Sequence, residues 1–232
     1  MDYFLDTNVE IGYVFCTDPW NKESVQLFDI EDTLHYSYCV NEEFNLKFNS
    51  ILKEQNNFLY SLKHDLEIGN TNRSLSLQDL KNKAKIISLK REFAENKKTR
   101  IVEVLWEFSK QKHESDNSNN SVCSVKNLIV YIGKFIRGFK GKLICRKNDF
   151  EREVIFHPKR DEKYMEINEK LLYDAEIHYP DNCIILDAHH LSLNECIAIE
   201  FVTADDEMIK KVNNIIDSLR IDKFHYLKDF LK

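Results

Sequence analysis

Short apolar segments alternate with helical patterns at both ends of the chain, and this alternation limits the folds that the sequence can adopt. Residues 3–5 and 198–203 are apolar enough for buried strands, and residues 35–40 are rich in the aromatic side chains that strands favour. Apolar residues at helical spacing follow each segment. Strands that alternate with helices favour a parallel sheet covered by helices. The sequence therefore predicts a three-layer α/β/α fold with a mostly parallel central sheet.

The middle of the chain has longer helical periods and few strand signals. Apolar spacing predicts a long helix over 77–112, and residues 113–121 have so few apolar side chains that they predict an exposed loop. A further helix is expected over about 124–141, where two glycines end it, and a strand over 152–157. The middle is therefore predicted to be a helical region inserted between the sheet-forming ends.

The composition is that of a folded protein. Hydrophobic residues make up 43% of the chain and charged residues 31%, which excludes a disordered chain, and no apolar run is long enough to cross a bilayer. The N-terminus lacks the basic residues and the small-residue cleavage site of a secretion signal, so we expect a cytoplasmic protein. The six cysteines form no CxxC pair and lie in mostly apolar surroundings, which predicts reduced, buried thiols.

Acidic residues stand where the predicted strands end. Asp6 and Asp205 each follow an apolar strand, and Glu43 begins the helix after another. Asp187 lies in an apolar helical segment, where a carboxylate without a partner is costly; the sequence leaves open whether that helix starts at Asp181 or at Asp187 itself. In an open parallel sheet the ligand crevice lies at the carboxyl ends of the strands. These acids are therefore expected to converge on one site.

Each acid also has a simpler interpretation. Asp6 and Asp205 could cap turns, an acid at a helix start is favoured by the helix dipole, and Asp187 could face solvent. Taken together, however, four carboxylates in one place repel and raise one another's pKa, so a divalent cation is the natural counter-charge. Ligands that are all oxygen atoms select Mg²⁺ or Mn²⁺ over zinc. The joint pattern predicts a metal site.

Four short segments resemble the four acidic motifs of the PIN-domain (PilT N-terminus-like) family. The segments are FLDTN at 4–8, NEEF at 41–44, LDAHH at 186–190 and FVTAD at 201–205. The resemblance covers about residues 1–60 and 175–232, and the interval between the last two motifs is similar to that in the family. It implies one PIN-like domain over 1–232, with a core of 1–65 and 175–232 and a helical insertion at about 66–174.

The resemblance implies a metal-dependent nuclease, most often an endoribonuclease that hydrolyses RNA. It makes Asp6, Glu43, Asp187 and Asp205 the catalytic carboxylates, which hold one or two Mg²⁺ or Mn²⁺ ions. A bound ion activates water and neutralises charge on the phosphate during in-line attack. Many small family members are the toxins of toxin–antitoxin pairs, which implies an antitoxin protein as partner and a homodimer.

Several further residues are candidates for supporting roles. The resemblance makes Asn8 and Thr203 polar helpers, since a threonine hydroxyl can orient an acid or a water. Asp206 could replace or assist Asp205. Glu42 remains an alternative to Glu43. His190 lies one helical turn after the acid of LDAHH, where it could face the site or make a packing contact.

Basic residues cluster in the predicted insertion, in the segment KFIRGFKGKLICRK at 134–147. Arg137, Lys140, Lys142 and Arg146 could bind substrate phosphates. The alternative is a solvated helix end, since cations favour a helix C-terminus. The net charge of −6 does not decide between these interpretations, because a bound metal neutralises clustered acids.

Two other functions fit parts of the pattern. A PIN-like scaffold would bind metal weakly and recruit RNA or a protein through the insertion, with little or no catalysis. An aspartyl-nucleophile phosphohydrolase also has an Asp after its first strand, but its second acid usually follows two residues later, where this chain has Asn8. The metal-dependent ribonuclease is therefore the first hypothesis and the phosphohydrolase the last.

Overall fold

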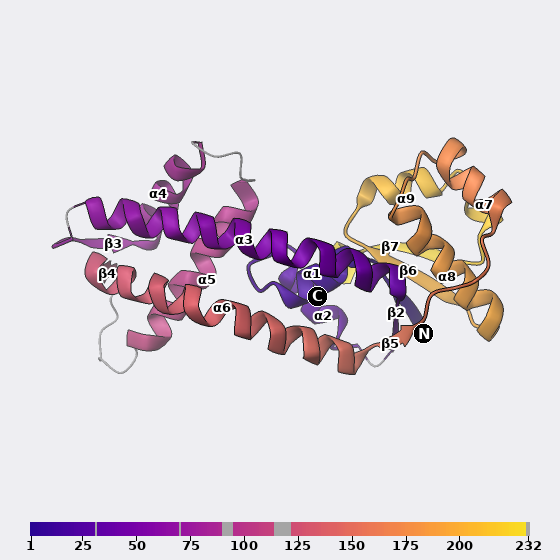
Figure 1. Cartoon of the computed structure of the whole chain (residues 1–232), viewed down its shortest axis with the longest axis horizontal. Coiled ribbons are helices and arrows are strands. Elements are labelled where there is room, and N and C mark those ends of the chain that lie inside the picture. The colour runs from indigo at the N-terminus through magenta and orange to yellow at the C-terminus, as the bar shows by residue number, and fades with distance from the viewer. Residues whose placement is uncertain (31, 70, 90–94, 114–121, 231–232) are drawn as a thin grey trace. The chain divides into compact units, whose positions relative to one another are not determined.

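The central sheet is parallel throughout, as the alternation of strands and helices predicts (Figure 1). The computed structural model describes residues 1–30, 32–69, 71–89, 95–113 and 122–230. In sheet order the strands are β5 (Ile155–His157), β2 (Thr33–Ser37), β1 (Asp2–Leu5), β6 (Ile199–Thr203) and β7 (Lys223–Tyr226). The chain is therefore an α/β protein, compatible with three α/β/α layers.

Helices make up most of the rest of the described chain. They are α1 (Thr7–Val14), α2 (Asn21–Leu27), α3 (Tyr38–Ile68), α4 (Leu77–Leu89), α5 (Glu95–His113), α6 (Val125–Glu153), α7 (Met165–Glu169), α8 (Asp181–Glu195) and α9 (Asp206–Val212). A π-helix η1 (Lys170–Asp174) and the 3-10 turns η2 (Ile216–Ser218) and η3 (Leu227–Phe230) complete them. The short strands β3 (Ser74–Ser76) and β4 (Val122–Ser124) form a separate antiparallel pair.

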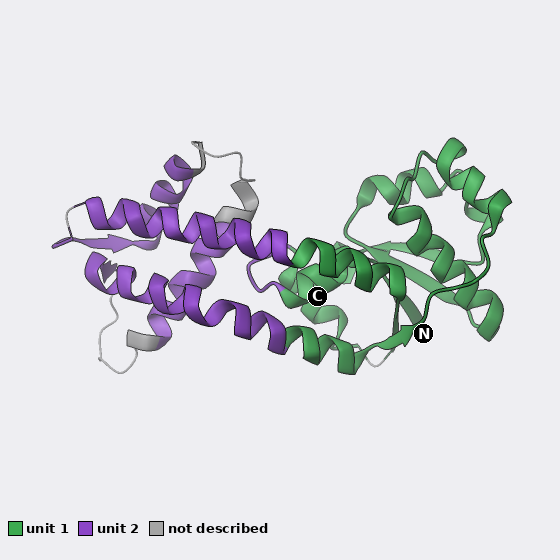
Figure 2. Cartoon of the chain, in the orientation of Figure 1, with its two compact units in different colours: residues 1–14, 20–48, 146–232 green, residues 15–19, 49–145 purple. Residues whose placement is uncertain are grey.

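The chain divides into two compact units (Figure 2). Unit 1 comprises Met1–Val14, Trp20–Phe48 and Arg146–Lys232, and unit 2 comprises Phe15–Pro19 and Asn49–Cys145. Unit 1 contains the parallel sheet, whose core includes the stacked rings of Phe4 and Phe201 from neighbouring strands. Unit 2 is helical, and its core is built from leucines and aromatic residues of α3, α4, α5 and α6, among them Leu62 and Phe139.

The boundaries of these units differ from the expected core and insertion. Residues 146–174 belong to unit 1 because β5 pairs in parallel with β2 and extends the sheet. Residues 49–65 belong to unit 2, where the apolar side chains of this part of α3, such as Leu59, are buried. β7 extends the other side of the sheet and was not expected from the sequence.

Several expected element boundaries also change. The predicted strand 35–40 ends at Ser37, and α3 begins at once. The predicted helix over 77–112 is two helices, α4 and α5, with residues 90–94 outside the described residues, as are 114–121 of the expected polar loop. α6 continues past both glycines to Glu153, because its buried apolar stripe continues beyond them.

The cysteines are free thiols, but the expectation that they are buried was wrong for most of them. Cys123 is buried, whereas Cys145 and Cys196 are exposed and the other three are half-buried. Cys196 ends α8 in a left-handed conformation. None of the helices in the described ranges is both long and apolar enough to cross a membrane.

Candidate functional site

Two strand ends meet at the carboxyl edge of the sheet. β1 and β6 are neighbours, so the Asp6 amide at the end of β1 donates to the Val202 carbonyl at 3.0 Å. The Thr203 hydroxyl donates to Asp6 Oδ2 at 2.7 Å, and Asn8 Nδ2 donates to the same oxygen at 3.0 Å. The amide of Thr7 donates to Asp6 Oδ1 at 2.7 Å. Asp6 is thus buried and held by three hydrogen bonds.

Glu43 of α3 is joined to this strand end through a threonine. The Thr7 hydroxyl donates to Glu43 Oε2 at 2.6 Å, and the Lys47 ammonium, one turn further along α3, forms an ion pair with Glu43 Oε1. Glu42 is exposed and accepts a hydrogen bond from the Tyr38 hydroxyl. Of the two adjacent acids, Glu43 is therefore the one that faces Asp6.

The third acid of the cluster is Asp181, the first residue of α8. The pKa of Asp181 is raised to about 6: burial is the largest cause, the charges of Glu43 and Asp205 add to it, and Lys47 opposes them. The pKa of Asp6 is likewise raised to about 7: burial is the largest cause, the Thr203 hydrogen bond opposes it, and the charges of Asp181 and Glu43 add to it. Acids from four separate elements thus act on one another in unit 1.

Asp205 is both part of this cluster and a helix cap. Its Oδ1 accepts from the amides of Glu207 at 2.9 Å and Met208 at 3.0 Å, which satisfies two free donors at the start of α9. Its own amide donates to the Thr203 hydroxyl at 3.0 Å. Asp206 is exposed and pairs with Lys210 at 2.7 Å, which lowers the pKa of its carboxyl. Asp206 therefore takes no part in the cluster.

Asp187 does not join the other acids, which corrects the expectation from the sequence. It follows Asp181 by six positions in one helix, a rotation of about 240°, so the two side chains leave α8 on different faces. Asp187 is buried and pairs with the guanidinium of Arg160. His190 also lies elsewhere, with its Nδ1 at 2.8 Å from the Tyr164 hydroxyl.

The predicted phosphate-binding cations have different surroundings. Arg146 donates from Nε to the carbonyls of Tyr13 at 2.9 Å and Val14 at 3.0 Å, so it caps the end of α1. The Lys142 ammonium lies over the Phe108 ring, 5.0 Å from its centroid. Arg137 and Lys140 are exposed on α6. A substrate role for Arg146 is thus replaced by a structural one.

The donor set suits a hard divalent cation, but its present arrangement is not a closed ligand group. Within the described ranges, no three His, Cys, Asp or Glu side chains are arranged to hold a metal ion. Two features account for this: Glu43 is engaged by Lys47, and Asp205 by the start of α9. The fit therefore lies in the chemistry of the donors, which are all carboxylates. Burial is the main reason that the pKa values of two of them, Asp6 and Asp181, are raised.

Sequence reasoning missed Asp181, Thr7 and Lys47. The pair Pro180-Asp181 does signal a helix start, and a helix that starts there places Asp181, not Asp187, at the end facing the other acids. The angular position of each residue around the helix, counted from this start, is the signal that could have identified Asp181. Lys47 follows Glu43 by four positions, which is the spacing of an ion pair on one helix face.

Comparison of the chain with family models, with curated proteins and with solved structures finds no match.

Proposed function

We propose that the chain is a nuclease dependent on Mg²⁺ or Mn²⁺, and that it hydrolyses phosphodiester bonds of RNA. The observation that carries the proposal is the acid cluster of Asp6, Glu43, Asp181 and Asp205 at the carboxyl edge of the sheet. The cluster is built from four elements, and burial, together with the charges of neighbouring acids, raises the pKa of Asp6 and Asp181. Such an arrangement is costly without a cation and useful with one. The resemblance of the four motifs to those of PIN domains supports RNA as the substrate.

The residues of the cluster have separate tasks. Thr203 and Asn8 fix the Asp6 carboxylate through its Oδ2, and Thr7 links Asp6 to Glu43. A bound Mg²⁺ or Mn²⁺ supplies Lewis-acid chemistry, which lowers the pKa of water and offsets the charge that develops on phosphate. In the structure the Lys47 ammonium forms an ion pair with Glu43. Glu43 would therefore have to leave this ion pair in order to hold a metal ion.

A binding protein without catalysis is the second candidate. Its support is the same ion pair: Lys47 already supplies a positive charge to Glu43, and the described side chains do not form a ligand group of three. In that case Mn²⁺ would bind weakly and RNA would remain intact. Calorimetry with Mn²⁺ and a cleavage assay on the same protein separate the two functions.

The decisive variants change charge without changing shape. Asp205→Asn removes a carboxylate yet keeps the cap of α9, because Asn caps helices as well as Asp does. Asp181→Asn removes the acid of α8. We expect each to reduce Mn²⁺-dependent cleavage of a fluorogenic RNA by about 100-fold or more. Asp206→Asn, on the neighbouring exposed acid, is the matched control and should retain activity. Full cleavage by Asp181→Asn and Asp205→Asn contradicts the proposal.

A further inference from the structure

Charge is distributed very unevenly between the two units. Unit 2 has 18 Lys and Arg residues against 11 Asp and Glu residues, a formal charge of +7. Unit 1 has 15 against 28, a formal charge of −13. The net charge of −6 conceals this separation. A strongly basic unit attracts polyanions, so unit 2 has the charge needed to bind one although the whole chain is acidic.

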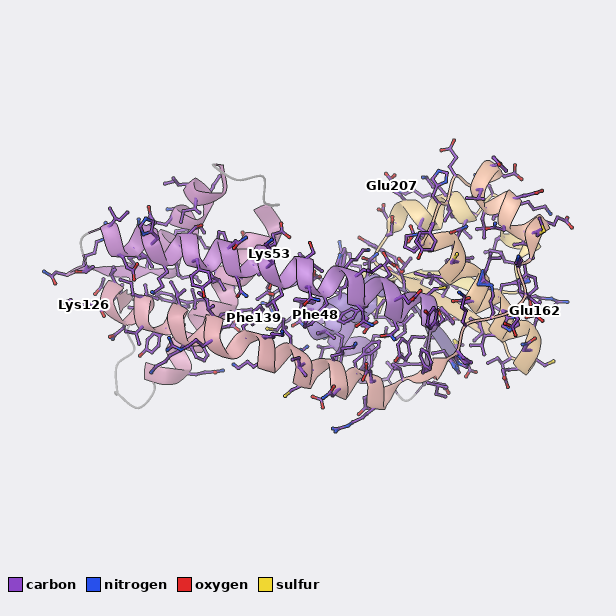
Figure 3. The ribbon with its side chains drawn as sticks, viewed as in Figure 1. Phe48, Lys53, Lys126, Phe139, Glu162 and Glu207 are labelled. Carbon is purple, nitrogen blue, oxygen red and sulfur yellow. The ribbon has the colours of Figure 1, made fainter. Side chains whose placement is uncertain are left out.

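The part of α6 that lies in unit 2 carries positive charge with no acid between its cations. Residues 122–145 contain five Lys and Arg residues and no Asp or Glu. One face of α6 is buried and includes Phe139, which is labelled between α3 and α6 in Figure 3. Lys126, near the start of α6, belongs to the exposed face. The exposed cations of this second face, which we call the outer face of α6, are Lys126, Lys134, Arg137 and Lys140. From first to last they span about 21 Å of helix, a length over which one strand of a duplex carries about six phosphates.

These cations have little negative charge near them. Among the described residues, none of the four forms an ion pair with an acid. A second cation approaches from α3: at Gly133 a Cβ would lie 3.7 Å from Arg137 Nη1 and 4.0 Å from Lys63 Cε. Lys63 pairs with Glu67 at 3.1 Å, but Arg137 has no such partner there.

The backbone of α6 is unusually open on the same side of the unit. Gly138 and Gly141 are exposed, and a Cβ at either position would meet no atom within 4 Å. A glycine inside a helix costs about 1 kcal/mol relative to alanine, and no packing contact with another described residue accounts for either one. Small residues beside exposed cations leave room for a bulky partner to approach the helix closely.

We infer that the outer face of α6 binds the phosphate backbone of RNA. The inference names where the substrate of the proposed nuclease is held, and in that sense it rests on the proposed function. Phosphate contacts of this kind position a nucleic acid without reading its sequence. Lys142 and Arg146 are not part of the face, since Lys142 packs over Phe108 and Arg146 caps α1.

The test is the salt dependence of RNA binding by the full chain. A fluorescein-labelled oligo(U) of about 20 nucleotides is titrated in EDTA, where no metal-dependent cleavage occurs, and anisotropy is recorded over a range of salt concentrations. The variant carries Lys126→Gln, Lys134→Gln, Arg137→Gln and Lys140→Gln. We expect its affinity to fall at least about tenfold at about 0.15 M salt, and its log–log salt slope to fall by about 0.7 for each lost phosphate contact.

A matched control distinguishes the effect of the outer face of α6 from the effect of the total charge of the protein. Lys22→Gln, Lys163→Gln, Lys223→Gln and Lys228→Gln remove the same charge from exposed positions of unit 1 and should leave affinity and slope nearly unchanged. Equal losses in both variants, or none in the first, overturn the inference, as does a loss confined to anionic lipid vesicles. Equal binding of the matching DNA strand supports it, because phosphate contacts do not distinguish the sugars.

Cleavage in Mn²⁺ is measured separately on the same proteins. RNA that binds the wild type through the outer face but stays uncut leaves the inference standing and removes the nuclease. RNA that is cut equally well by the wild type and the first variant leaves the nuclease standing and removes the outer face. The two failures are therefore distinguishable.

Discussion

The acids of the cluster make the stability of the metal-free protein depend on pH. The pKa values of Asp6 and Asp181 are raised from 3.8 to about 7 and about 6, so the folded state favours their protonated forms. Their contribution to stability is fully present below about pH 4 and is lost as pH rises through these folded values. The cluster therefore costs most above about pH 7 in the absence of metal.

Asp181→Asn removes one of these costs. In EDTA at about pH 8 we expect the variant to exceed the wild type in free energy of unfolding by about 1 kcal/mol, after allowance for solvent screening of this half-buried group. The difference should vanish at about pH 4, where both side chains are neutral. Urea unfolding at both pH values measures it. The same difference at both pH values shows that the charge of Asp181 is not its cause.

Removing the charge of Asp187 should destabilise the protein, in contrast to removing that of Asp181. Asp187→Asn leaves the Arg160 guanidinium, only 12% exposed, without its counter-charge. We expect a loss of about 3 kcal/mol in stability with Mn²⁺ binding retained, because Asp187 stands apart from the cluster. Urea unfolding and calorimetry measure the two quantities. Asp29→Asn, at an exposed acid, should change stability by less than about 0.5 kcal/mol. Loss of Mn²⁺ binding in Asp187→Asn returns Asp187 to the metal site.

At the scale of elements, the glycines of α6 do not predict where the helix ends. Gly138 and Gly141 lie on the exposed face, where they leave the backbone hydrogen bonds of the helix intact, while Phe139, Leu143 and Phe150 continue the buried stripe. Packing of that stripe outweighs the low helix propensity of two exposed glycines. The same competition between packing and propensity is invisible in the sequence until the buried face is known.

Alanine at these glycines should therefore stabilise the protein. We expect Gly138→Ala and Gly141→Ala each to add about 0.5–1 kcal/mol to the free energy of unfolding, measured in urea, because the new methyl group meets no neighbour. Gly12→Ala in α1 is the contrasting control. Its Cβ would lie 2.2 Å from Ser24 Oγ and 3.1 Å from a backbone carbonyl, so it should destabilise. If Gly138→Ala or Gly141→Ala destabilises the protein, the space around these two glycines is not open.

α1 depends on α6 for its C-terminal cap. Arg146→Met removes the donors to the Tyr13 and Val14 carbonyls but keeps an apolar stem, and we expect a loss of about 1–2 kcal/mol in thermal or urea unfolding. Arg152→Met, whose side chain is 76% exposed, should change stability by less than about 0.5 kcal/mol. If the two variants unfold alike, Arg146 is no cap and its role in substrate binding is open again.

At the scale of the whole molecule, the sequence predicts the parallel α/β fold but not the division of the chain. The strand ends that carry Asp6 and Thr203 were predictable, because apolar runs followed by polar residues mark the carboxyl edge of a parallel sheet. β7 was not, since its alternating KFHY segment is short and half-exposed. Residues 49–65 continue a helix begun in unit 1, and periodicity alone does not show where a helix passes from one unit to another.

The candidate site was predictable to the same extent. Residue type and position after a strand placed Asp6 and Asp205 at the carboxyl edge of the sheet. The position of Asp181 relative to Asp187 required the start of α8 and its helical phase. The ion pair of Glu43 with Lys47 depends on side-chain conformation, which spacing permits but does not fix.

Anomalous diffraction from crystals soaked in Mn²⁺ tests the central claim most directly. We predict a manganese peak among the carboxylates of Asp6, Glu43, Asp181 and Asp205, with Glu43 turned away from Lys47. A peak beside Asp187 instead, or none at the carboxyl ends of β1 and β6 in Mn²⁺-soaked crystals, contradicts the proposed metal centre and the nuclease built on it.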